Sequence, residues 1–105
     1  MANGRDTKEI KRIRIELLVA LKVVYPAALQ SDQLLRSLLV LFPTLEFDGL
    51  RRDLHYLHEK GYIQRAGIEP DSDHFMTPWR RRWFRLTPLG MELADHCIHD
   101  PAMEE

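Results

Sequence analysis

The sequence predicts an α+β domain in which three helices come first, a two-stranded hairpin follows, and one further helix closes the chain. The first observation is an apolar stripe at helical spacing from Phe47 to Leu57, on a segment that ends at Gly61. The second is that this segment passes directly into a β-type run over 62–68. A polar, proline-bounded loop then leads to another β-type run over 80–86, which is typical of a hairpin.

The bulk composition fits one globular domain. The chain has 105 residues, 45% of them hydrophobic and 30% charged, so we expect a single domain over 1–105 with frayed ends at 1–5 and 100–105. No apolar run is longer than that of 38–42, which is too short to span a bilayer, and the polar N-terminus is unlike a signal peptide. One cysteine cannot form an internal disulfide, which favours a reducing, cytoplasmic setting.

The formal net charge of −1 hides an uneven distribution. Residues 1–30 carry six Lys/Arg against three Asp/Glu, and residues 62–87 carry five Arg against three acids. Residues 88–105 carry five acids and no Lys or Arg. Because phosphate binding depends on the local field, a near-neutral total does not exclude a nucleic-acid partner.

The first helix is expected to begin at Asp6 or Thr7, where Asp6 and Glu9 have capping-box spacing, and to end before Pro26. Its core-facing stripe consists of Ile10, Ile13, Leu17, Leu21 and Val24. A second apolar row projects from the opposite side and consists of Ile15, Val19 and Val23. The last helix of the same chain would be one cover for this row. We favour a dimer interface, because one small core does not easily cover both faces of a helix.

The second helix follows Ser31, the expected cap, and runs through Phe42 until Pro43 closes it. A turn of a few residues then leads to the third helix, which suits a helix-turn-helix corner. Thr44 is expected to cap this third helix, which covers 45–60.

The last helix is expected to follow Thr87 as its cap, with Pro88 at its first position, where a missing N–H costs nothing. One face of it is lined by Leu89, Leu93 and Cys97. The other face carries Met91 and Ile98, which we assign to the same dimer interface as the second row of the first helix.

Two stretches resemble the winged helix-turn-helix class that contains the MarR, ArsR and PadR regulators. Residues 50–63, Leu-Arg-Arg-Asp-Leu-His-Tyr-Leu-His-Glu-Lys-Gly-Tyr-Ile, are similar to its recognition helix and first wing strand. Residues 84–94, Phe-Arg-Leu-Thr-Pro-Leu-Gly-Met-Glu-Leu-Ala, are similar to its R-L-T-x-x-G-x-x-L closing of the wing. The spacing is also similar to that of small regulator-like proteins of Mu-type phages and prophages. One departure is that Glu46 and Asp48 stand in the first helical turn, where acids repel phosphate.

The resemblance implies a winged helix-turn-helix fold with a three-helix core, a two-stranded wing and a C-terminal helix. A recognition helix reads bases in the major groove from its N-terminal part. The candidate residues are Thr44, Asp48, Arg51, Arg52, His55 and Tyr56. Arg52 has the planar fork that matches the two acceptors of guanine, and Arg51 and His55 are placed for phosphates or bases. The alternative is a solvated Asp48–Arg52 pair, worth about 0.3–0.5 kcal/mol.

The most basic short stretch is Trp79-Arg80-Arg81-Arg82-Trp83, at the base of the expected wing. We assign Arg80, Arg81 and Arg82 to the DNA backbone or the minor groove. Strand alternation puts Phe84 and Leu86 on the core side. The alternative is that Arg82 or Arg85 pairs with acids on the last helix. The loop acids oppose phosphate binding at the wing tip; they are Glu69, Asp71 and Asp73.

No motif in the sequence predicts catalysis or a cofactor. The spacings His55-x-x-His58 and His96-Cys97-x-His99 suit metal ligands, but a lone cysteine and surface histidines do not define a site, so no metal is predicted. Neither a Gly-rich phosphate loop nor a nucleophile motif is present, so we do not expect an enzyme.

We therefore predict a homodimeric double-stranded-DNA-binding protein, a transcriptional regulator without a membrane partner. The rival interpretation is a protein–protein module of the same fold that docks through an aromatic wing. Its anchors would be Phe75, Met76, Trp79 and Trp83.

Overall fold

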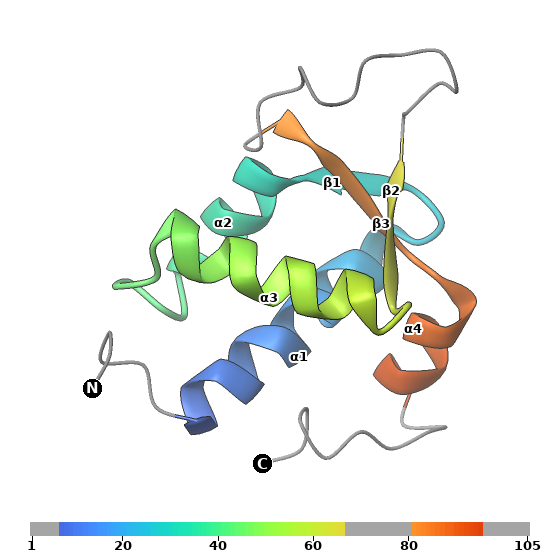
Figure 1. Cartoon of the computed structure of the whole chain (residues 1–105). Helices are drawn as coiled ribbons and strands as arrows, with labels where there is room; N and C mark the ends of the chain where they lie inside the picture. Colours follow the sequence, from blue (N-terminus) through green and yellow to red (C-terminus); the bar gives the residue numbers. More distant parts are fainter. Residues whose placement is uncertain (1–6, 67–80, 96–105) are drawn as a thin grey trace.

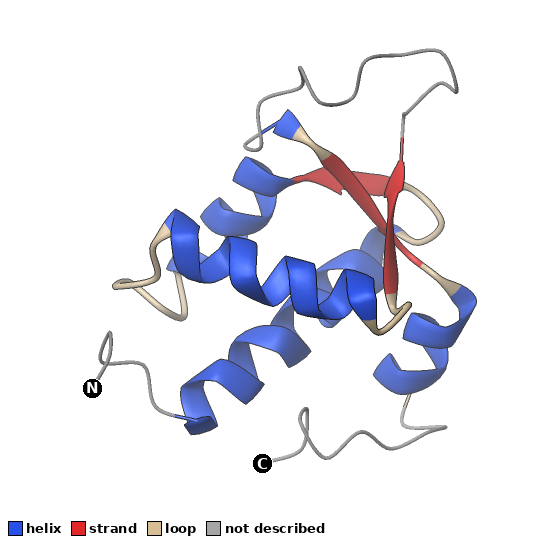
Figure 2. Cartoon of the chain, in the orientation of Figure 1, coloured by secondary structure: helices blue, strands red, loops and turns tan. Residues whose placement is uncertain are grey.

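Four helices and one three-stranded antiparallel sheet make up residues 7–66 and 81–95, the part of the chain that the computed structural model describes (Figures 1 and 2). In chain order they are α1 (Thr7–Val24), β1 (Ala28–Gln30), α2 (Ser31–Leu39), α3 (Phe47–Glu59), β2 (Ile63–Ala66), β3 (Trp83–Leu86) and α4 (Pro88–Ala94). In Figure 1, α3 lies across α1, and α4 follows β3 at the end of the sheet. The predicted α+β class is confirmed.

The sheet has the order β1-β3-β2, so the last strand in the sequence lies in the middle. The expected pairing of the two longer runs is confirmed by β2 and β3. β2 begins at Ile63, one residue later than predicted, and β3 begins only at Trp83, since Arg81 and Arg82 are not in the strand. The third strand, β1, was not predicted. It has only three residues, Ala-Leu-Gln, with no alternation to mark it, and it is extended because it adds to the free edge of β3. The expected loop over 69–78 lies outside the described residues.

The register decides which side chains share a face of the sheet. Residues directly opposite in an antiparallel pair project to the same side. Phe84 is opposite Leu29 in β1 and opposite Arg65 in β2, so these three side chains face the helices. Phe84 is 4% exposed and Leu86 is 0% exposed, which confirms the predicted core side of β3. Trp83, on the other face, is 40% exposed.

Apolar side chains from all four helices and from β2 and β3 form the core. The predicted stripes are fully buried at Ile13, Leu17 and Leu21 of α1 and at Leu50, Leu54 and Leu57 of α3. The predicted stripe residues nearest the helix ends are only half-buried; they are Ile10, Val24 and Phe47. Leu18 is also buried, although it lies between the two predicted rows of α1. Of the second row, Ile15 is partly buried against the core, whereas Val19 and Val23 are 42% and 80% exposed.

Two of the predicted helix caps are wrong. Gln30, not Ser31, caps α2, and its backbone N–H donates to the side-chain oxygen of Gln33 at 2.8 Å. Ser31 is instead a buried first helical residue that donates to the carbonyl oxygen of Arg82 through its backbone N–H and its hydroxyl, at 3.0 and 3.2 Å. Glu46, not Thr44, caps α3, and Thr44 lies exposed in the turn before it.

Helix ends also differ from the predicted ones. α2 ends at Leu39 rather than Phe42, because the chain turns there to reach α3. The predicted stop of α3 is confirmed: Gly61 has a φ of 82°, and the N–H of Tyr62 donates to the carbonyl of Leu57 at 3.0 Å. This left-handed turn closes the helix and starts β2 directly.

The start of α4 follows the prediction. Thr87 caps it by accepting a hydrogen bond from the N–H of Gly90 at 3.0 Å, and Pro88 occupies the first turn. Leu89 does not lie on the buried face as expected, since it is 42% exposed while Gly90 and Leu93 are buried. The helix turns this way because Gly90 packs directly on the backbone of Tyr62. The predicted partners Cys97 and Ile98 lie outside the described residues.

Replacement of Gly90 tests this packing. A Cβ atom at position 90 would lie 2.0 Å from the carbonyl oxygen of Tyr62, so α4 or the start of β2 must shift. We expect Gly90→Ala to lower the free energy of unfolding by about 2 kcal/mol in urea titrations, as for an overpacked core. The control Glu92→Ala, on the exposed side of α4, should change it by less than about 0.5 kcal/mol. Equal free energies of unfolding for the two variants would show that Gly90 does not pack closely on the backbone of Tyr62.

Candidate functional site

The polar side of α3 is the starting point of the candidate site. Leu50, Leu54 and Leu57 have no exposed surface, so one side of the helix is committed to the core. The opposite side exposes Asp48, Arg51, Arg52 and His55.

An ion pair at the α1–α3 contact helps to hold that orientation. Nε of Arg14 donates to Oδ1 of Asp53 at 3.2 Å, and the Asp53 side chain is only 1% exposed. The same guanidinium stacks on the ring of Tyr56, 3.8 Å from its centroid. A cation beside a buried carboxylate offsets part of its lost hydration. Tyr56, one of the predicted DNA-binding residues, is therefore partly buried on the α1 side of the helix and is covered by Arg14.

The structure brings residues of α3 and the start of β3 together around one open groove. The groove has a volume of about 500 Å³ and is lined by Asp48, Arg51, Arg52, His55 and Arg82. All five were predicted as DNA-binding residues from sequence. Three guanidinium groups against one carboxylate make its lining cationic.

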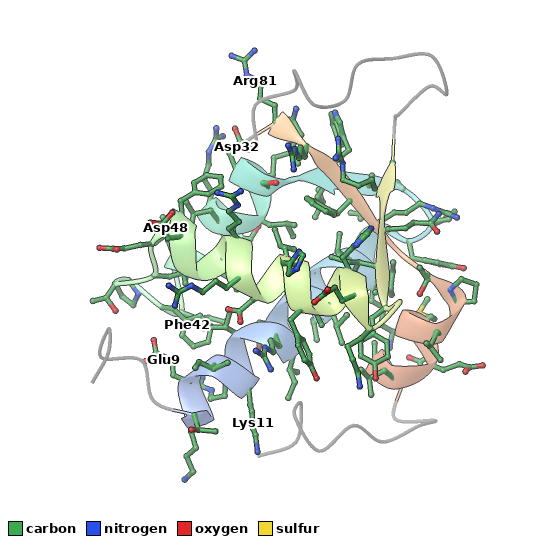
Figure 3. All side chains as sticks on the ribbon, viewed as in Figure 1. Glu9, Lys11, Asp32, Phe42, Asp48 and Arg81 are labelled. Atoms are coloured by element: carbon green, nitrogen blue, oxygen red, sulfur yellow. The ribbon has the colours of Figure 1, made fainter. Side chains whose placement is uncertain are left out.

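The segment that carries Arg81 and Arg82 is fixed by backbone hydrogen bonds. The carbonyl of Arg82 accepts both bonds from Ser31, and the carbonyl of Arg81 accepts from the Gln30 side chain at 3.3 Å. Arg81 itself points away from the body of the protein, above the start of α2, while Asp48 lies at the N-terminal end of α3 (Figure 3). Arg80, the third predicted wing residue, lies outside the described residues.

The Asp48–Arg52 surface pair, which was the alternative to DNA reading, is not among the ion pairs of the described residues. The ion pair on this side of α3 lies one turn further along, where Nε2 of His55 is 3.3 Å from Oε1 of Glu59. The pair is exposed at both ends, and it counts as a salt bridge only when the imidazole is protonated.

A smaller pocket adjoins the groove at the sheet. It has a volume of about 240 Å³ and is lined by Leu54, His55, His58, Arg65, Arg82 and Phe84. Burial and, secondarily, the charge of Arg82 lower the pKa of Arg65 below its ordinary value. Sequence reasoning did not single out Arg65, because only the strand register brings it to Arg82.

Four of the five predicted dimer residues lie in α1 and α4, and the fifth, Ile98, is outside the described residues. These two helices are joined by a surface ion pair between Lys22 and Asp95. Val19 and Val23 are exposed there, whereas Ile15 and Met91 are partly buried against the core. The alternative to a dimer interface was that α4 covers the second apolar row of α1. In the structure α4 neighbours α1, but Val19 and Val23 of that row remain exposed.

Comparisons with protein-family models, with curated proteins and with solved structures found no match for this chain. No helix within residues 7–66 and 81–95 has the length and apolar character needed to cross a membrane. Within the same ranges, no group of three or more His, Cys, Asp or Glu side chains is arranged to hold a metal ion. The second spacing weighed for a metal, at His96, Cys97 and His99, lies outside them.

Removal of the Arg14 charge tests the orientation of α3. We expect Arg14→Met to lower the free energy of unfolding by about 3 kcal/mol in urea titrations, because Asp53 then stays buried without its cation. Lys8→Met, an exposed position of the same helix, is the control and should change little. Adding Asp53→Leu to Arg14→Met should recover part of the loss. If the double variant loses as much free energy of unfolding as Arg14→Met alone, then packing by Arg14, and not its charge, holds the helix.

Proposed function

We propose that this protein is a winged-helix DNA-binding protein in which α3 is the recognition helix. The element order supports the fold, since three helices and a short first strand precede an antiparallel β2–β3 pair. α3 has 13 residues and is therefore about 20 Å long, which suits the major groove. In this proposal β2 and β3 are the strands of the wing.

The groove between α3 and the start of β3 carries the proposal. Arg51 and Arg52 from the helix and Arg82, which directly precedes β3, line one continuous cationic surface, which is the arrangement that a duplex backbone beside a major groove requires. Asp48 at the helix start opposes phosphate, but a carboxylate at a base edge can accept from the amino group of cytosine. We assign Arg52 to base reading and Arg81 and Arg82 to the backbone.

The Trp83 side chain supports a second candidate function, a protein–protein module. It is 40% exposed on the face of the sheet that does not meet the helices. An exposed tryptophan is a common anchor of protein interfaces. The groove arginines favour DNA over this alternative, because a protein partner docked on Trp83 would leave them unused.

Duplex binding in a mobility-shift or fluorescence-anisotropy titration tests the proposed function. At low salt we expect Arg51→Ala/Arg52→Ala to weaken binding by about 10- to 100-fold and to reduce the slope of log affinity against log salt by about 1–2. Lys8→Ala/Lys11→Ala removes the same charge from α1, whose residues do not line the groove, and should change affinity by less than about threefold. The assignment is wrong if the wild-type protein binds no duplex, or if Arg51→Ala/Arg52→Ala binds duplex as tightly as the wild type does.

We further propose that the protein acts as a homodimer through the exposed row of α1. Val19 and Val23 are large apolar side chains left in solvent, and a two-fold contact there would bury them. The two recognition helices would then address half-sites about 34 Å apart.

Sedimentation equilibrium checks the dimer. We expect a mass of twice 12.4 kDa for the wild type, and a monomer for Val19→Glu/Val23→Glu, because two buried carboxylates disfavour the contact. Val40→Glu, at an exposed valine that follows α2, is the matched control and should remain dimeric. Monomeric wild type at tens of micromolar would remove this interface.

A further inference from the structure

We propose that the pocket between α3 and the sheet binds a phosphate group, held by Arg65 and Arg82 with His55 and His58 at its rim. The phosphate group is the chemistry that the pocket would recognise. It would come either from the backbone of a bound duplex or from a free phosphorylated ligand. The duplex source rests on the proposed function, whereas the pocket itself does not.

The floor of the pocket is apolar and its walls are cationic or imidazole groups. Leu54 and Phe84 are 0% and 4% exposed and form the floor. Arg65, Arg82 and the two histidines supply the polar lining, and no acidic side chain is among the described residues that line it. A volume of about 240 Å³ holds a phosphate group with several waters, since one water takes about 30 Å³.

The sheet forces the two arginines together. Arg65 lies opposite Phe84 in the register, and Arg82 precedes Phe84 by two residues, so both side chains project from the helix-facing side. Ser31 fixes the backbone of Arg82 from the other edge through two hydrogen bonds. The two guanidinium groups therefore cannot move apart by a shift of the strand.

This placement costs free energy unless an anion joins it. Two like charges share a partly buried space, and the depressed pKa of Arg65 reports the burial and the neighbouring charge. Nε of Arg65 and Nε of Arg82 are both buried with no hydrogen-bond partner among the described residues. Buried donors without partners are uncommon in proteins, and here both belong to the side chains that face one pocket.

A phosphate group fits these donors better than a carboxylate does. Guanidinium forks donate in parallel pairs to phosphate oxygens, and imidazole N–H groups add single donors. A tetrahedral phosphate presents oxygens in several directions, whereas a carboxylate presents two in one plane. Glu59 contacts His55 on the exposed side of the rim and would restrain the orientation of that imidazole.

The position of the pocket explains how it would serve a duplex. Arg82 and His55 line both the pocket and the groove along α3. A backbone strand that follows the groove would therefore place one phosphate over the pocket. This contact would fix the register of the duplex without reading its sequence.

Titration with inorganic phosphate tests the pocket without DNA. Followed by NMR at constant ionic strength, phosphate should saturate shifts of the His55 and His58 rings and of the Arg65 Nε–H signal, and acetate should bind at least about 10-fold more weakly. Phosphate should also raise the melting temperature of the wild type. Arg65→Gln/Arg82→Gln should lose both responses. Arg85→Gln, in β3 but on the other face of the sheet from Arg65, should keep them.

The double variant also has a folding control. Because it removes two like charges, it should melt at or above the wild-type temperature when phosphate is absent. The proposed phosphate site is wrong if phosphate does not change the NMR signals of the wild type. It is also wrong if the double variant responds to phosphate as the wild type does.

Duplex titrations separate the two sources of the phosphate. If a backbone phosphate occupies the pocket, Arg65→Gln should weaken duplex binding by about 10-fold, because Arg65 lines the pocket and is not among the residues that line the groove. One neutral methylphosphonate position in the duplex should reproduce the loss. If inorganic phosphate binds but no duplex does, the proposed function fails and the pocket stands as a site for a free phosphorylated ligand. If duplex binds equally well to Arg65→Gln and phosphate alone gives no response, the pocket fails and DNA binding through the groove stands.

Discussion

The contact between α1 and α3 is the constraint on which the rest of the structure depends. Three fully buried leucines commit one side of α3, and the Arg14–Asp53 pair adds a polar link that a rotated helix would lose. A shift by one residue would turn α3 by about 100° and would exchange leucines for charged groups in the core. The exposed position of Arg51, Arg52 and His55 is therefore a consequence of core packing.

The central strand supplies the second half of the candidate site. β3 pairs on both sides, and its beginning is tied to α2 through Ser31. Because its register is fixed, Arg82 reaches the groove beside α3, and Arg65 from β2 is brought to the same place. Cationic groups from three separate segments thus meet at one end of the recognition surface that we propose.

Sequence periodicity predicted the helices because long amphipathic segments carry a strong signal, as in α1 and α3. It did not predict β1, whose three residues are extended only through pairing with β3. The caps at Ser31 and Thr44 were wrong because side-chain preference is a local signal, whereas the tertiary bonds of Ser31 to Arg82 decided where α2 begins. Arg65 could not be found at all, since a register across a long connection cannot be derived from residue spacing.

The central claim is that the polar side of α3 and the start of β3 form one duplex-binding surface. A map of backbone amide shifts during titration with a short duplex at low salt tests it most directly. The account predicts that the largest changes fall on Asp48, Arg51, Arg52 and His55 in α3 and on Arg81 and Arg82 before β3. Changes confined to the side of α1 and α4, or no changes at saturating duplex, would contradict it.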